Sequence, residues 1–210
     1  MKDTDKREVI LLKAEELFSK HGFKGTSTRS LAKAAKVNLG MLTYYFGTKD
    51  KILRALIDRK LGFYRDSFMM IDKLDVPTIK KVEAIIDVYV EHMIANRRFH
   101  RILQSEVMSD KHSASLEYAY SVIKENRQFL IRILEKGKKN KEFRDVDCSL
   151  FMTSITGSIM QIIKSENLVL SCLTASEKIE AVDDPKFISR MKVFLKEIAH
   201  GYLLEQSKKK

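Results

Sequence analysis

The fold of this chain is decided by residues 22–50, GFKGTSTRSLAKAAKVNLGMLTYYFGTKD. This stretch predicts two short helices, one over 28–35 and one over 39–46, joined by a tight turn at 36–37. Asn38 stands where the second helix begins, and its side chain is a good N-cap. Two short helices joined in this way predict a helix-turn-helix unit.

The rest of the chain also favours helix. Its 210 residues are 44% hydrophobic and include only 2 prolines and 8 glycines, so long stretches contain no helix breaker. Apolar residues recur at helical spacing on both sides of the short pair, and Thr48 can cap the helix that follows it. We therefore expect an all-α fold of about nine helices, with an N-terminal three-helix helix-turn-helix domain and a C-terminal helical domain.

The C-terminal part contains five further predicted helices. Their expected ranges are 77–95, 97–108, 113–139, 148–164 and 185–202. The segment 168–182 shows no decisive pattern and stays unassigned. His92, Asn96, His100 and Gln104 recur every four residues, which gives a polar stripe only if one helix runs through all four. Such a stripe would supply polar groups to a ligand pocket, with a metal site as the less favoured interpretation.

Positive charge is concentrated near the N-terminus. The net charge is +11, and residues 1–64 hold 14 Lys/Arg against 7 Asp/Glu, whereas residues 65–210 hold 25 against 21. A basic segment over 1–64 followed by a nearly neutral remainder is typical of a protein that binds nucleic acid, although a basic solvated surface explains the charge equally well.

The stretches 22–35, 37–46 and 48–50 together resemble the DNA-binding domain of TetR-family transcriptional regulators. The similarity runs over residues 4–64 without a gap. Three departures stand inside it: Lys36 where a turn glycine is common, Asn38 where serine is usual, and Thr43 where many members have tyrosine. They leave the expected fold unchanged and make the operator sequence harder to infer.

The resemblance implies a DNA-binding domain over 4–64, with the helix-turn-helix at 27–46, and an effector-binding and dimerisation domain over 65–210. It also implies that Arg29 touches a base edge or phosphate and that Lys49 binds a phosphate. Hydroxyls at a helix N-terminus bind phosphate well, although Thr26 is also the expected structural cap, and Tyr44 and Tyr45 have ordinary packing as the alternative. The expected DNA-contacting residues are Thr26, Ser27, Thr28, Arg29, Asn38, Leu39, Gly40, Met41, Thr43, Tyr44, Tyr45 and Lys49.

Dimerisation is expected through the last two predicted helices. The helix over 148–164 is apolar nearly all round, so it must be covered on more than one side. Its pairing with the stripe over 187–202 resembles the family's four-helix dimer interface, and a monomer in which both helices are core is the alternative. The expected interface residues are Phe151, Ile155, Ile159, Ile162, Met191, Phe194, Ile198 and Tyr202.

An unknown small-molecule effector is the expected ligand, and no cofactor or metal is expected. Each residue of the predicted pocket has plain core packing as its alternative. The predicted pocket consists of Phe63, Phe68, Met69, Met93, Leu103, Val107, Tyr118, Phe129 and Phe151.

These features predict a homodimeric repressor that leaves a pseudo-palindromic double-stranded DNA operator when its effector binds. The alternative is a basic helical protein that binds DNA or anionic surfaces without specificity. No phosphate loop, nucleophile elbow or metalloprotease motif is present, so we expect no enzyme. Two cysteines suggest a reducing cytoplasm, and the longest charge-free stretch, over 148–163, is shorter than the ~20 residues of a membrane span.

Overall fold

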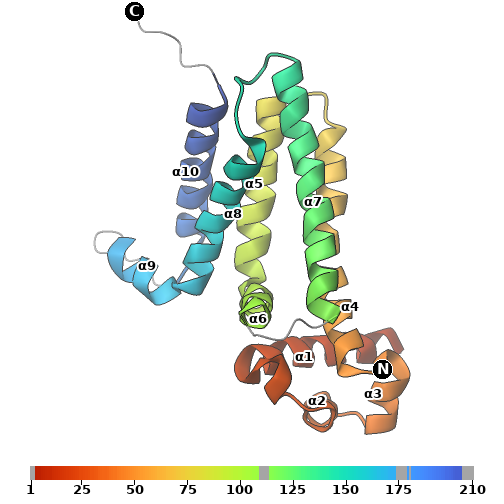
Figure 1. Ribbon diagram of the computed structural model, residues 1–210. Helices are drawn as coiled ribbons and strands as arrows, with labels where there is room; N and C mark the ends of the chain where they lie inside the picture. Colours follow the sequence, from red (N-terminus) through yellow and green to blue (C-terminus); the bar gives the residue numbers. More distant parts are fainter. Residues whose placement is uncertain (1–2, 109–113, 174–178, 180, 205–210) are drawn as a thin grey trace, which may run out of the picture. The chain divides into compact units, whose positions relative to one another are not determined.

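The computed structural model describes residues 3–108, 114–173, 179 and 181–204. These residues form ten α-helices and no strand, which confirms the all-α expectation. The helix beyond the expected nine is α9, which lies in part of the segment that the sequence left unassigned (Figure 1). The helices are α1 (Asp3–Gly25), α2 (Thr28–Ala34), α3 (Leu39–Phe46), α4 (Lys49–Asp72), α5 (Thr78–Ala95), α6 (Arg97–Val107), α7 (Ala114–Lys139), α8 (Cys148–Lys164), α9 (Glu166–Leu173) and α10 (Pro185–Leu203).

The chain divides into two compact units. Unit 1 comprises Met1–Phe63 and Arg98–Lys124, and unit 2 comprises Tyr64–Arg97 and Glu125–Lys210. Helices α4 and α7 each contribute residues to both units. The domain boundary expected at residue 64 stays a prediction.

The end of α1 turns sharply at Gly22. This residue has φ 72° and ψ 163°, a conformation that L side chains rarely adopt. The turn brings the Phe23 ring edge-to-face against Phe18, with centroids 5.2 Å apart. The hydroxyl of Thr26 donates to the carbonyl oxygens of Gly22 at 2.8 Å and Leu17 at 3.2 Å. This side chain therefore fixes the connection between α1 and α2.

Ser27, not Thr26, caps α2, which corrects the sequence-based choice of cap. The Ser27 hydroxyl accepts from the amide of Ser30 at 3.0 Å, and the Ser27 amide donates to the Ser30 hydroxyl at 3.1 Å, a reciprocal capping box. Thr26 is only 2% exposed and its hydroxyl is already engaged with α1. The predicted caps Asn38 and Thr48 are confirmed by their bonds to the amides three residues on.

Unit 1 has an apolar core. Leu42 and Phe46 of α3 are buried, as their helical spacing predicts. In α7, the hydroxyl of Ser115 donates to the carbonyl of Asp50 in α4. Other core side chains are Ile10, Ala14, Phe18, Leu31, Ile52, Leu53, Leu56 and Ile57.

Unit 2 is organised around α5, which packs against α8 and α10 (Figure 1). Acidic residues spaced four apart on α5 meet basic residues spaced four apart on α10, so the two helices run antiparallel. The pairs are Glu83–His200, Asp87–Lys196 and Glu91–Lys192.

The polar stripe considered from the sequence is interrupted. Helix α5 ends at Ala95, and the Asn96 side chain donates to the His92 carbonyl at 2.8 Å, one turn back. His92 and Asn96 therefore belong to unit 2, whereas His100 and Gln104 lie on α6 in unit 1. Among the described residues, no helix combines the length and apolarity required to cross a membrane.

Candidate nucleic-acid interface

Helix α3 turns one face into unit 1 and the other to solvent. Its buried face holds Leu42 and Phe46, whereas Tyr44 is 84% exposed and Gly40 and Thr43 are also exposed. Tyr44 lies edge-to-face on Tyr45, at a centroid distance of 5.4 Å. An eight-residue helix with small and hydroxyl-bearing side chains outward can enter a DNA major groove, which is about 12 Å wide.

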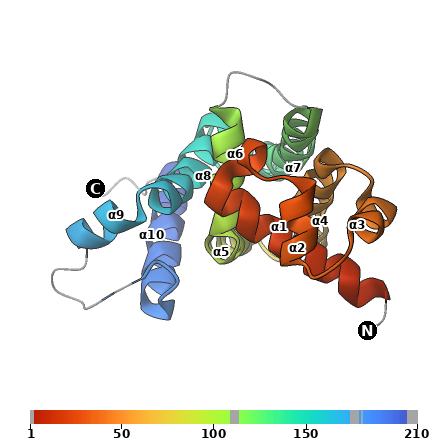
Figure 2. The ribbon, with the colours of Figure 1, turned by 90° about the horizontal axis from the view of Figure 1, so that it is seen from below.

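The start of α3 is held by Asn38, whose Oδ1 accepts from the Met41 amide at 2.7 Å. The side chains of Leu39 and Asn38 are exposed and Met41 is half-buried. Of the predicted DNA-contacting residues between positions 38 and 45, only Met41 and Tyr45 are partly covered by their own unit. Helix α2 contacts α3 directly, and Figure 2 displays this pair from below.

Helix α2 presents its N-terminal turn to solvent at Ser27 and Arg29, with Thr28 half-buried. Ser27 uses its hydroxyl for capping, so Arg29 is the exposed charged group of this turn. Thr26 is buried and both its amide and its hydroxyl donate to carbonyls of the preceding turn. The expectation that the Thr26 hydroxyl meets DNA is therefore corrected, because burial and internal bonding remove it from the surface.

Lys49 opens α4 and is half-buried. Its ammonium donates to the carbonyl oxygens of Phe23 at 2.7 Å and Thr26 at 2.9 Å. The same nitrogen lies 4.3 Å from the centroid of the Phe23 ring. Sequence reasoning missed these internal contacts, because they join residues more than twenty positions apart.

Unit 2 contains a cluster of polar-tipped aromatic rings. Tyr64 lies 5.2 Å from Tyr89 and 4.6 Å from His92, centroid to centroid. Phe68 lies 5.4 Å from Tyr89 and stacks on Phe129 at 6.5 Å. Burial raises the pKa of both tyrosines, so their hydroxyls stay protonated at neutral pH. We call these five residues the aromatic cluster.

The predicted pocket residues are divided between the units. Phe68, Met69, Met93, Phe129 and Phe151 belong to unit 2, and Met69 among them is exposed. The cluster residues Tyr64 and Tyr89 were absent from the prediction, and His92 entered it only through the polar stripe, although the helical spacing of all three relative to Phe68 and Met93 was available in the sequence.

The other four predicted pocket residues, Phe63, Leu103, Val107 and Tyr118, lie in unit 1. Phe63 and Val107 are exposed there, and Leu103 is buried. The hydroxyl of Tyr118 donates to the Asp58 carboxylate, and Arg54 lies over its ring at 5.1 Å. Tyr118 therefore links α7 to α4 within unit 1, and its assignment to the pocket stays a prediction.

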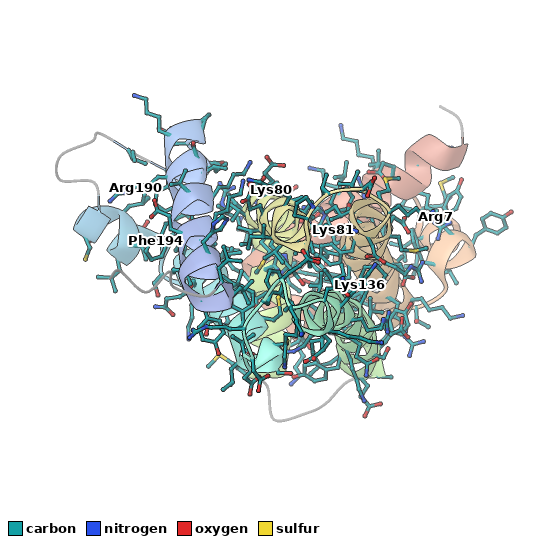
Figure 3. The ribbon with its side chains drawn as sticks, turned by 90° about the horizontal axis from the view of Figure 1, so that it is seen from above. Arg7, Lys80, Lys81, Lys136, Arg190 and Phe194 are labelled. Carbon is teal, nitrogen blue, oxygen red and sulfur yellow. The ribbon has the colours of Figure 1, made fainter. Side chains whose placement is uncertain are left out.

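The predicted interface residues also divide into two sets. Phe194 and Ile198 on α10 are 55% and 38% exposed, and Ile162 and Tyr202 are half-buried. Figure 3 shows Phe194 and Arg190 on the side of α10 that faces away from α5.

A correction applies to the other four, Phe151, Ile155, Ile159 and Met191. They are at most 5% exposed within the single chain, so they have almost no area left for a partner. Sequence reasoning missed Leu150 on α8 and Val193 on α10, which are 64% and 54% exposed.

Metal binding receives no support from the described residues, which contain no group of three or more His, Cys, Asp or Glu side chains that could hold an ion. Both cysteines are free thiols: Cys148 is buried, and burial raises its pKa to about 11, whereas Cys172 is exposed.

Comparison with known proteins agrees with this geometry. Residues 10–56 match the family described as bacterial regulatory proteins, tetR family. The chain is 30% identical over 150 residues to the HTH-type transcriptional repressor KstR2 of Rhodococcus jostii, covering 69% of this chain and 72% of that protein.

Two solved structures share the fold. The ketosteroid transcriptional regulator KstR2 of Mycobacterium tuberculosis has a TM-score of 0.74 and 17% identity, covering 95% of each chain. AibR, solved with isovaleryl coenzyme A and operator DNA, has a TM-score of 0.70 and 14% identity, covering 92% of this chain and 97% of its own.

The family is one of regulators and not of enzymes, so the expectation of no catalytic activity is confirmed. The matched segment contains both short helices, the turn between them and the start of α4. Together with the identity to KstR2 over most of both chains, it shows that this chain belongs to the TetR family of DNA-binding transcriptional regulators.

Proposed function

We propose that this protein represses transcription by placing two copies of α3 on a pseudo-palindromic operator, and that a small-molecule effector bound in unit 2 releases it. The observation that carries the proposal is the exposed outer face of α3 above a buried Leu42 and Phe46. One such helix reads few bases, whereas two copies about one DNA turn apart read a palindrome. We place the protein in the cytoplasm, where its operator is.

Base recognition is assigned to α3 and Arg29. Thr43 and Met41 suit thymine methyl groups, the Tyr44 hydroxyl suits a phosphate, and the planar fork of Arg29 suits guanine. Ser27, Thr28, Asn38, Leu39, Gly40 and Tyr45 complete the proposed contact surface.

The test selects a duplex from a random library with the wild-type protein and measures binding by fluorescence anisotropy. Arg29→Ala should cost about 1–3 kcal/mol of binding free energy and relax base preference at one position of each half-site. Tyr44→Phe should weaken binding to every sequence, because it removes a phosphate contact. Tyr120→Phe, the same change on an exposed tyrosine of α7, is the matched control. Equal binding by all four proteins would refute the assignment.

Dimerisation is assigned to the outer faces of α8 and α10. Leu150, Val193, Phe194 and Ile198 expose apolar area there that a monomer leaves in water. Phe194→Glu should convert the dimer into monomers in sedimentation velocity. Met70→Glu, at a 71% exposed apolar residue of α4, should leave the dimer intact. A dimer that survives Phe194→Glu would exclude this face.

The effector is assigned to the aromatic cluster. Phe68, Phe129 and Met93, which follows His92 on α5, favour a largely apolar molecule, and the Tyr64 and Tyr89 hydroxyls favour one polar group on it. Native mass spectrometry of protein purified from its host should detect a retained compound of that kind. Tyr89→Phe keeps the ring and removes the hydroxyl, so it should weaken retention. Retention unaffected by this change and by Met93→Ala would exclude the cluster.

A further inference from the structure

We propose that Arg7 and Lys51 form a phosphate clamp at the C-terminal end of α3, in which each cation binds one phosphate of the DNA backbone. The clamp rests on the proposed placement of α3 in a major groove. Both residues lie outside the set of DNA contacts that the resemblance implies. They add to Lys49, whose ammonium has a third N–H beyond the two that its carbonyl contacts use.

The length of α3 brings both of its ends close to the DNA backbone. A helix of 8 residues is about 12 Å long, which matches the width of a major groove, also about 12 Å. When such a helix lies across the groove, each end meets one of the two phosphate strands that border it. The C-terminal end is the unfavourable one, because free carbonyl groups concentrate negative charge there and repel a phosphate. Cations at this end remove the repulsion.

Arg7 reaches this end of α3 from α1. Its side chain is exposed, and its guanidinium carbon lies 5.3 Å from the ring centroid of Phe46, the last residue of α3. Both partners are held in place, because Phe46 is buried and so are Ile10 and Leu11, which follow Arg7 on α1. A guanidinium over a ring uses its face for that contact. Its N–H donors point outward in its own plane, so they stay available to a phosphate.

Lys51 reaches the same end of α3 from α4. A Cβ at Gly47, the C-cap of α3, would lie 3.7 Å from Cδ and 3.9 Å from Nζ of Lys51. The exposed lysine side chain therefore extends over the turn that directly follows Phe46, in space that the glycine leaves open. Two cations from two different helices thus meet at the last turn of α3.

Neither cation has an acidic partner among the side chains that the structure describes. Glu8, the acidic neighbour of Arg7, pairs with Arg59 of α4 instead. A cation near a helix C-terminus can also stabilise the helix itself, without any contact to DNA. The two roles differ in the salt dependence of DNA binding, because only a phosphate contact releases counterions.

The test compares wild type with Arg7→Gln, Lys51→Gln and the double variant in the full-length protein. Glutamine keeps a polar side chain and removes the charge, whereas Arg7→Lys keeps the charge. Lys124→Gln, the same change at an exposed lysine of α7 in unit 1, is the matched control. Affinity for the selected duplex and for a random duplex is measured by fluorescence anisotropy across salt concentrations. The temperature is one at which circular dichroism shows every variant to be folded.

Each single glutamine variant should reduce the slope of log affinity against log salt by about 0.9, and the double variant by about 1.8. At about 0.1 M salt this corresponds to roughly eightfold weaker binding for each lost phosphate contact. The loss should be the same on both duplexes, because phosphate contacts carry no sequence information. Arg7→Lys and Lys124→Gln should leave the slope unchanged.

An unchanged slope in the double variant would overturn the proposal. Weaker binding at an unchanged slope would assign the two cations to stabilisation of α3 alone, and an equal loss of slope in Lys124→Gln would reduce them to general positive charge. If wild type selects no sequence, the proposed operator recognition fails. The slopes on the random duplex still decide in that case whether Arg7 and Lys51 bind phosphate.

Discussion

Gly137 occupies the last turn of α7 because the Phe143 ring lies against it. A Cβ at this position would lie 2.5 Å from Cε2 of Phe143, closer still to Cδ2, and 3.1 Å from Cγ2 of Thr78. Ordinary contact begins at 3.4 Å, so Gly137→Ala would require the ring to retreat by about 1 Å. The ring is 5% exposed, and its backbone is anchored on both sides: the Phe143 amide donates to Gly137, and the Arg144 amide donates to Leu203.

Two opposing effects decide the result. Overpacking an anchored aromatic ring costs about 1–3 kcal/mol of unfolding free energy, whereas alanine in place of helical glycine returns at most about 1 kcal/mol. Gly137→Ala should therefore destabilise the protein by about 1–2 kcal/mol. For a chain of 210 residues this lowers Tm by roughly 2–8 °C.

The assay is thermal unfolding by circular dichroism at fixed protein concentration, because dimerisation makes Tm depend on concentration. Gly62→Ala is the matched control: it lies inside α4 with nothing within 4 Å of its Cβ position, so it should raise stability by about 0.5–1 kcal/mol. Phe143→Leu should cost less in the Gly137→Ala background than in wild type, because the steric conflict is shared. A Gly137→Ala protein as stable as Gly62→Ala would refute the reasoning.

Three further predictions concern single local features. Lys36 has a φ of 54° in the turn between α2 and α3, so Lys36→Gly should raise Tm by relieving a left-handed backbone that costs roughly 1 kcal/mol, and a lower Tm would contradict this. Hydrogen bonds from the Thr78 amide and then from its hydroxyl lower the pKa of the Glu142 carboxyl below its ordinary 4.5. Glu142→Gln should therefore destabilise the protein at pH 7, and the difference in stability from wild type should vanish as the pH falls through and below 4.5. A stability difference that persists in acid would contradict this. Asp87→Lys and Lys196→Asp should each lower Tm, because each breaks the ion pair between these two residues. The double variant restores opposite charges, so it should regain most of the lost Tm in a melting experiment. Losses of Tm that simply add would exclude a direct interaction between the two side chains.

Local features of this fold could be predicted from the sequence. The caps at Asn38 and Thr48 are confirmed because each depends only on a side chain and an amide three residues later. The choice between Thr26 and Ser27 could not be made in the same way. Both carry a hydroxyl, and the decision depends on carbonyls of α1 that accept from Thr26 after the turn at Gly22.

The predicted pocket stays a prediction, because the placement of its residues depends on tertiary structure. Apolar residue type identified Phe68 and Met93 as buried, but it could not show that residues 98–124 join the N-terminal unit. Tyr118 was assigned to the pocket for its ring, whereas its hydroxyl and its ring both contact α4 within unit 1. Nothing in the periodicity of α7 distinguishes the part that belongs to unit 1 from the part that belongs to unit 2.

Helix α8, which is apolar on nearly all sides, shows the same limit of sequence-based prediction for a dimer interface. Periodicity shows that Phe151, Ile155 and Ile159 form a stripe that must be buried, but not whether the chain itself or a second copy buries it. Contact of α8 with α5 answers this for the inner stripe, which is already covered. The stripe left for a partner holds Leu150 and Gly157, one large side chain and one position open to close approach. If a second α8 lies against it, Gly157→Ala should weaken the dimer in sedimentation equilibrium although it favours the isolated helix; an equally tight and more heat-stable dimer would place the partner elsewhere.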